Sequence, residues 1–117
     1  MPLHHSINYL EIPSENLSAS KVFFETVFHW QFTDYGDEYT AFHNDSIAGG
    51  FYRSSTPSRT KSGAALIVFF SKNLEQSLAD VTQACGQISQ DIFAFPGGRR
   101  FHFIEPGGSE FAVWSEV

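Results

Sequence analysis

Two residues of this 117-residue chain are candidates for acid–base chemistry, Glu11 and His102. Glu11 lies between the apolar residues Leu10 and Ile12, and His102 lies between two Phe residues. Such alternation is typical of a β-strand with one face packed under helices. We therefore expect both ionisable side chains on the opposite, open face of their strands.

Each candidate has two interpretations. Glu11 could act as a general base among aromatic neighbours, or it could be a carboxylate at the rim of a sheet that bonds to a neighbour. His102 could be an acid/base partner, or it could be a hydrogen-bonding side chain of the same rim. The residue types alone leave both alternatives open.

Large aromatic side chains are expected on the same open face, from the strands that contain Tyr9, Tyr52, Phe70 and Trp114. Rings of this kind suit stacking against a flat or apolar ligand, although aromatic residues at strand spacing also build cores. Together with Glu11 and His102 they form our predicted ligand-binding set.

The elements that position these residues occur twice. Residues 9–30 read as a strand, a polar break and a helix, and the same order returns in residues 66–88. Asn16 and Asn73 each precede a Leu and lie four residues before a Ser, at an offset of 57 residues. Asn is a favoured N-cap, so both positions predict the start of a helix.

Three strands are expected after each helix. The first predicted helix spans 16–28, and the second opens at Asn73 and stops at Gly86, with Leu74, Leu78, Val81 and Cys85 as its buried stripe. The predicted strands are 7–12, 31–35, 39–43, 47–52, 64–70, 88–95, 100–104 and 110–114. This order predicts an α+β fold of two βαβββ modules, 6–52 and 63–116, joined by a polar linker at 53–62.

Composition excludes several classes of function. A net charge of −6 argues against a nucleic-acid partner, which needs a basic surface. The single cysteine supplies neither a disulfide framework nor a zinc-type cysteine pair. No signal peptide or membrane-length apolar run is present, so we expect a cytoplasmic protein that does not enter a membrane. Thirteen Phe exceed what a modest core needs, which favours a pocket or a second subunit.

The segments EIPSEN, FFETVFHW and FIEPGGSEFAVW, with Gly49 and Gly50 between them, resemble the glyoxalase/bleomycin resistance/dioxygenase family, the vicinal oxygen chelate superfamily. The closest likeness is to proteins related to lactoylglutathione lyase. The resemblance implies modules that curl into half-barrels around a cavity, with helices outside. It also implies a homodimer with an aromatic interface.

Metal enzymes of this family hold a divalent ion through four side chains on the inner strands. By the resemblance these positions correspond to Ile7, Gly50, Leu66 and Ala112, none of which offers a side-chain ligand. The resemblance therefore implies a member without metal or other cofactor.

Two functions remain as hypotheses. The first is a binding protein for a small apolar or aromatic molecule, analogous to the drug-sequestering branch of the family. The alternative is a lyase or isomerase acting on a small carbonyl compound. Such an enzyme would use acid/base residues alone, or a displaced metal site built from Glu11, His102 and Glu110.

Overall fold

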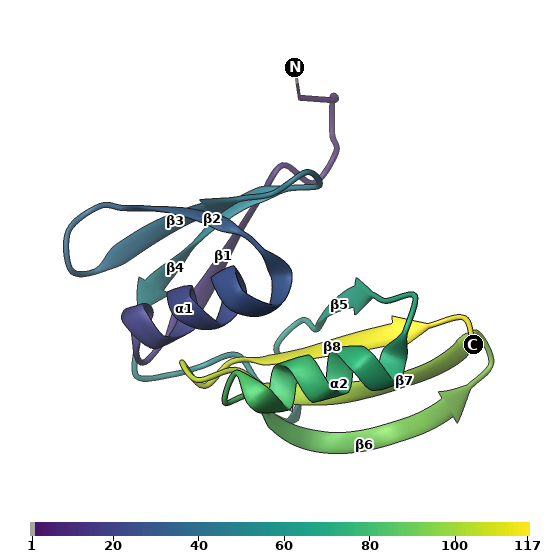
Figure 1. The fold of residues 1–117 in the computed structure, drawn as a ribbon. Coiled ribbons are helices and arrows are strands. Elements are labelled where there is room, and N and C mark those ends of the chain that lie inside the picture. Colours follow the sequence, from purple (N-terminus) through teal and green to yellow (C-terminus); the bar gives the residue numbers. More distant parts are fainter. Residues whose placement is uncertain (1) are drawn as a thin grey trace.

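A computed structural model describes residues 2–117, which form two βαβββ modules in succession (Figure 1). Module one consists of β1 (Tyr9–Ser14), α1 (Leu17–Phe28), β2 (Gln31–Asp34), β3 (Tyr39–His43) and β4 (Ala48–Arg53). Module two consists of β5 (Ile67–Phe70), α2 (Leu74–Gln83), β6 (Gln87–Phe95), β7 (Gly98–Ile104) and β8 (Glu110–Ser115). A short 3₁₀ helix, Thr60–Ser62, lies between the modules.

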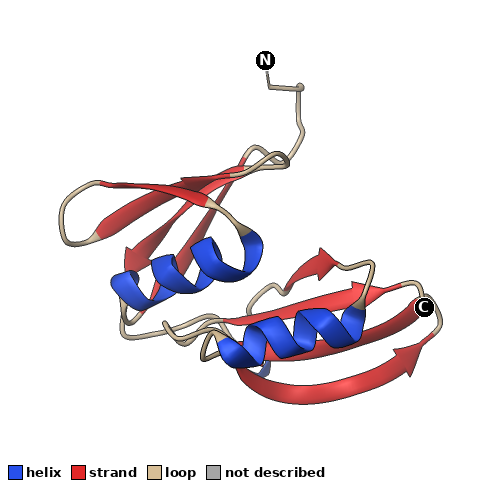
Figure 2. Cartoon of the chain, viewed as in Figure 1, coloured by secondary structure: helices blue, strands red, loops and turns tan. Residues whose placement is uncertain are grey.

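Each module has one four-stranded mixed sheet with a helix against one face (Figure 2). The strand orders are β1-β4-β3-β2 and β5-β8-β7-β6, so the first strand of each module lies at a sheet edge. It pairs in parallel with the last strand of its module, and the remaining pairs are antiparallel. The predicted α+β architecture is confirmed. No helix within residues 2–117 is long and apolar enough to cross a membrane.

The 57-residue repeat extends to individual hydrogen bonds. Asn16 Oδ1 accepts from the Ala19 amide at 3.1 Å, and Asn73 Oδ1 accepts from the Gln76 amide at the same distance. A serine at the end of the first strand, or directly after it, bonds to a serine in the helix, with oxygens 2.7 Å apart in both modules. These pairs are Ser14 with Ser20 and Ser71 with Ser77. Both predicted N-caps are therefore correct.

The first helix ends at Phe28 as predicted, whereas the second ends before its predicted stop at Gly86. His29 takes the left-handed conformation after α1, with φ 59°. Helix α2 ends at Gln83, and Cys85 makes the left-handed turn with φ 74°. Cys85 is consequently exposed, so its predicted place in the buried stripe was wrong. Gly86 serves close packing instead of the turn, because a Cβ there would lie 2.5 Å from Val81 Cγ1.

One aromatic core joins the two modules. Phe24 of α1 is fully buried, with its ring centroid 5.3 Å from that of Phe51 in β4 and 5.1 Å from that of Phe111 in β8. Phe28 of the same helix stacks on Phe69 of β5 at 4.1 Å. Helix α1 therefore packs against the helix-side faces of both sheets. The opposite faces turn away from this shared core, so neither covers the other within one chain.

Ten of the thirteen Phe belong to this core or pack against it. The core therefore needs more Phe than the sequence suggested. The other three are Phe70, Phe93 and Phe95, all in strands of module two.

A buried carboxylate fastens the modules to each other. Glu105, 1% exposed in the turn between β7 and β8, accepts hydrogen bonds from Ser20 Oγ of α1 and from the amide of Gly107, both at 2.6 Å. The Ser109 amide donates to its other oxygen at 3.2 Å. Burial raises the pKa of Glu105, although these three donors oppose the shift.

The segment expected to be a linker is bonded to module one at its start, where the Ser54 amide donates to the Ser14 carbonyl at 3.0 Å, and to module two further along. The Ser58 amide donates to Ser109 Oγ at 3.1 Å, and Arg59 Nε donates to the Gly108 carbonyl at 2.7 Å. Arg53 at the start of the segment belongs to β4. Residues 58–60 are consequently held against the second module.

The repeat supplies a matched pair for measuring the bond between modules. Ser20 and Ser77 occupy equivalent positions, but only Ser20 also donates to Glu105. We expect Ser20→Ala to lower the free energy of unfolding by about 1–3 kcal/mol more than Ser77→Ala, because it removes a hydrogen-bond donor from the buried Glu105 side chain. Urea denaturation measures both. Equal losses would show that the Ser20–Glu105 bond does not stabilise the fold.

Candidate functional site

Each sheet has one face under the helix and one open face, which we call the concave face. In β1, Ile12 is buried and Leu10 is partly buried, whereas Tyr9 is 43% exposed and Glu11 is exposed. In β7, Phe101 and Phe103 are fully buried on the helix side. The predicted alternation thus places Tyr9, Glu11 and Tyr52 on the concave face of module one, and Val68, Phe70, His102 and Trp114 on that of module two.

On module one, three side chains form a hydrogen-bonded chain. Tyr39 Oη donates to Glu11 Oε2 at 3.0 Å and lies 2.5 Å from Tyr9 Oη. Since the Tyr39 hydroxyl donates its hydrogen bond to the carboxylate, Tyr9 is the donor in its bond with Tyr39. Burial, aided by hydrogen bonds with Tyr9 and Glu11, raises the pKa of Tyr39 well above its ordinary value. Tyr39 therefore stays a phenol at neutral pH.

Tyr39 was missing from the predicted set, and its neighbour Gly50 was the available signal. Gly50 lies beside Glu11 in the sheet, and a Cβ there would come within 2.0 Å of Tyr39 Oη. The phenol thus occupies the space that a side chain at position 50 would need. A glycine in the strand interior marks this close approach.

The structural repeat offers Tyr9 as an alternative to Ile7 among the positions that the family resemblance implies. Leu66 precedes Asn73 by seven residues, and the residue seven before Asn16 is Tyr9, not Ile7. Ile7 lies ahead of β1 and is 79% exposed. The corresponding set is therefore Tyr9, Gly50, Leu66 and Ala112, in which one phenol is the only polar side chain.

On module two, His102 is held by Glu110. His102 is 6% exposed, and its Nδ1 lies 3.0 Å from Glu110 Oε2. Glu110 Oε1 accepts from the amide of Thr60 at 2.8 Å and from its hydroxyl at 3.0 Å. Burial alone would raise the pKa of Glu110, but the bonds from His102 and Thr60 outweigh it and lower that pKa. His102 Nδ1 accordingly donates to a carboxylate, and its buried Nε2 has no partner.

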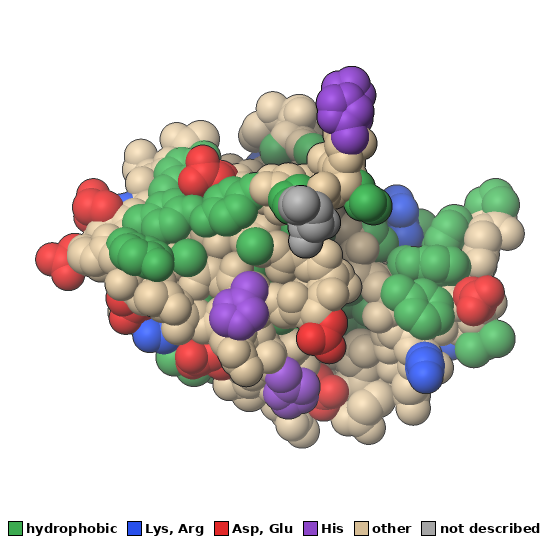
Figure 3. Space-filling view, turned by 90° about the horizontal axis from the view of Figure 1, so that it is seen from above, with side chains coloured by type: hydrophobic (Ala, Val, Ile, Leu, Met, Phe, Trp, Pro, Cys, Tyr) green, Lys and Arg blue, Asp and Glu red, His purple; other side chains and the backbone are tan. Residues whose placement is uncertain are grey.

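Aromatic rings cover the rest of this face. The ring centroid of Trp114 lies 5.2 Å from that of Phe70 and 6.3 Å from that of Phe95. The guanidinium carbon of Arg100 lies 5.3 Å from the Phe93 centroid and 5.4 Å from that of Phe95. Phe93 and Phe95 were not among the predicted ligand-binding residues, because β6 has irregular pairing that interrupts the alternation. Figure 3 shows apolar side chains gathered separately over module one, on the left, and module two, on the right.

The two acid–base candidates are not brought together. Glu11 bonds to Tyr39, and the acidic partner of His102 is Glu110. Within residues 2–117, no group of three or more His, Cys, Asp or Glu side chains could hold a metal ion. The displaced site from Glu11, His102 and Glu110 is therefore not assembled in this chain.

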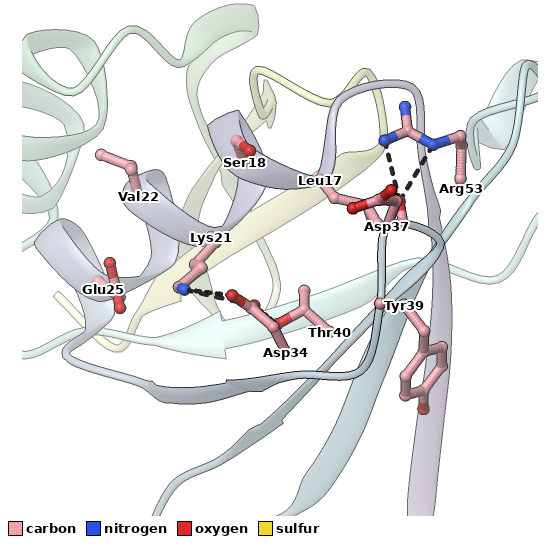
Figure 4. Close-up of a pocket in the computed structure, with 11 residues that line it drawn as sticks. Leu17, Ser18, Lys21, Val22, Glu25, Asp34, Asp37, Tyr39, Thr40 and Arg53 are labelled. Carbon is pink, nitrogen blue, oxygen red and sulfur yellow. Dashed lines mark hydrogen bonds and ion pairs between the residues drawn. The ribbon is translucent and has the colours of Figure 1, made fainter.

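A cleft of about 550 Å³ lies between α1 and the β2–β3 hairpin (Figure 4). Polar groups that already have partners line it, such as Lys21 Nζ, which lies 3.1 Å from Asp34 Oδ2. Figure 4 shows Tyr39 at its edge with the hydroxyl directed away from Lys21 and Asp34. The cleft is thus separate from the Tyr9–Tyr39–Glu11 chain.

Comparison with known proteins agrees with the fold. The profile of the Glyoxalase/Bleomycin resistance protein/Dioxygenase superfamily matches residues 6–113, and the chain belongs to this superfamily. No curated protein sequence matches the chain.

Solved structures share its architecture at low sequence identity. The fosfomycin resistance protein FosX from Listeria monocytogenes is 12% identical with a TM-score of 0.79, over 98% of this chain and 96% of that one. A glyoxalase/bleomycin resistance protein/dioxygenase family enzyme from Burkholderia phytofirmans PsJN is 11% identical, with a TM-score of 0.76 over 94% and 98%. Lactoylglutathione lyase from Agrobacterium tumefaciens is 12% identical, with a TM-score of 0.70 over 95% and 93%. At these identities the likeness shows the fold alone.

Because of the hydrogen-bonded chain on module one, we expect the free energy of unfolding to fall at alkaline pH. A tyrosine whose pKa is raised by folding contributes stability that is complete below its unfolded pKa of about 10 and is lost as pH rises through the folded value. We expect Tyr39→Phe to cost about 1–2 kcal/mol at pH 7 and to flatten the decline above pH 10. Urea unfolding between pH 7 and 11 measures both effects.

The control is Tyr35→Phe, at an exposed tyrosine. A Tyr39→Phe variant that declines like the wild type would contradict the assignment.

Proposed function

We propose that this protein binds a small apolar or aromatic molecule on its concave faces and does so without the metal of its superfamily. The observation that carries the proposal is the exposure of large side chains opposite a complete core. Phe70 is 52% exposed and Tyr9 43%, although each is part of an ordered strand. Rings held rigidly at a concave surface suit a flat ligand.

The residues present do not fit the family's divalent ion. Gly50, Leu66 and Ala112 offer no side-chain donor, and a hard or borderline cation needs oxygen or nitrogen ligands. A glutamate introduced at position 50 would meet the Tyr39 hydroxyl. We therefore assign no step to a metal.

A second copy of the chain is the proposed means of closing the site. The two concave faces turn away from the shared core, so one chain alone leaves both uncovered. Strand β5 (Ile67–Phe70) is a sheet edge made of four apolar residues, without the charge or proline that usually blocks edge pairing. An aromatic homodimer interface along this edge would place two concave faces against each other.

Thermal unfolding with ligands and chelators tests the proposed function. We expect EDTA, Ni²⁺ and Zn²⁺ to leave the midpoint unchanged, and a small aromatic compound to raise it. At a hundredfold excess over Kd the gain is about 2.7 kcal/mol, or several degrees. Trp114→Ala should abolish the shift. Tyr35→Ala, which removes an exposed aromatic ring in the connection between β2 and β3, should retain it.

Elemental analysis of the same preparation decides between the two functions. About one metal ion per chain, together with destabilisation by EDTA, would contradict the metal-free binding protein. It would favour the lyase or isomerase instead.

The homodimer has its own test. Light scattering at tens of micromolar should give about twice the chain mass of 13.1 kDa. Val68→Asp places a charge on the exposed side of β5 and should give monomers, whereas Val22→Asp, at an exposed valine of α1, should not. A monomeric wild type at that concentration would refute the shared site.

One observation supports the lyase or isomerase as a second candidate. Glu11 is exposed and accepts a hydrogen bond from Tyr39, which in turn is hydrogen-bonded to Tyr9. A carboxylate linked to two phenols could accept and return a proton of a small carbonyl substrate. Turnover that is lost in Glu11→Gln, without any change in ligand binding, would favour this candidate.

A further inference from the structure

The side chain of Arg100 differs from those of the other arginines in having no hydrogen bond within residues 2–117. Among residues 2–117 each of the other three is engaged by an acceptor: Arg53 by Glu38 at 2.8 Å, Arg59 by the Gly108 carbonyl at 2.7 Å, and Arg99 by Glu75 at 2.6 Å. Arg100 Nε is buried and unpaired. The chain has thirteen acidic residues and seven basic ones, yet no acidic side chain within residues 2–117 forms an ion pair with the Arg100 guanidinium.

Aromatic rings take the place of a counter-ion around Arg100. Its guanidinium lies over Phe93 and Phe95, and Trp114 is its partner across the strands. Cation–π contact holds the group in position but does not satisfy its N–H donors. A positive charge with free donors, fixed in an aromatic surface, is the arrangement that recognises an anion with an apolar body.

A second buried polar group on the same face is also unpaired. His102 lies two residues after Arg100 on β7. Its ring centroid is 5.9 Å from that of Phe93, the same ring that the Arg100 guanidinium lies over. His102 is 6% exposed, and its Nε2 has no hydrogen-bond partner. A buried polar atom without a partner is costly. Two such groups on one face indicate a polar ligand instead of a purely apolar one.

We propose that the concave face of module two binds an aromatic carboxylate, with Arg100 pairing to the carboxylate and the rings of Phe70, Phe95 and Trp114 against the aromatic part. A guanidinium matches the planar, two-oxygen geometry of a carboxylate. One arginine balances a monoanion, whereas a dianionic phosphate would call for further cations. This inference rests on the proposed function and names the class of ligand for it.

Isothermal titration with 2-naphthoate and its neutral isostere 2-naphthamide tests the inference. The wild type should bind the carboxylate at least about tenfold more tightly than the amide, because a charge-assisted hydrogen bond is lost with the amide. Arg100→Met keeps the apolar stem and should reduce the affinity for naphthoate to that for the amide. Arg99→Met is the matched control: it makes the same charge change one residue away, at the arginine paired with Glu75, and should keep the preference.

The outcomes separate the two proposals. Equal binding of naphthoate and naphthamide to the wild type would overturn the carboxylate inference while leaving the proposed function intact. Binding of neither compound would overturn both. An equal loss in Arg99→Met and Arg100→Met would show a general effect of charge, which also overturns the assignment to Arg100. If Arg100→Met does not fold, Arg100→Lys replaces it, and a preference reduced by the loss of the two-pronged contact supports the proposal.

Discussion

The packing of Phe24 is the constraint on which the rest of this structure depends. Its ring contacts Phe51 in one sheet and Phe111 in the other, and it is fully buried. A single helix of module one therefore serves both sheets. Because dense aromatic packing tolerates little displacement, this contact fixes how the modules are oriented. The buried Glu105–Ser20 bond restrains the same junction at its polar end.

This orientation decides what each concave face can do. With the helix-side faces occupied by the shared core, the open faces cannot enclose a cavity within one chain. Each face remains a surface whose chemistry is its own. Module one presents phenols and the carboxylate of Glu11, while module two presents rings, the guanidinium of Arg100 and the imidazole of His102. The repeat is thus preserved in its scaffold and not in its chemistry.

The contrast between scaffold and chemistry has a physical origin. Helix starts and strand ends are set by local hydrogen bonds, such as those of Asn16 and Asn73, which tolerate little change. Open-face positions have no such restriction, because alternate side chains of a strand point away from the core. The space over Gly50 is accordingly taken by the Tyr39 side chain.

Periodicity and capping in the sequence by themselves determined the two βαβββ modules, the helix starts and the face on which Glu11 and His102 lie, since these depend on neighbours in the chain. Only the tertiary structure decided the partners of those residues. Glu11 meets Tyr39 twenty-eight positions away and His102 meets Glu110, and no local pattern encodes such pairings. The end of α2 and the exposure of Cys85 were not predicted, because they depend on the left-handed turn that Cys85 takes directly after the helix. Likewise, the lack of a hydrogen-bond partner for Arg100 Nε depends on residues that are distant in the chain and could not be predicted from the sequence.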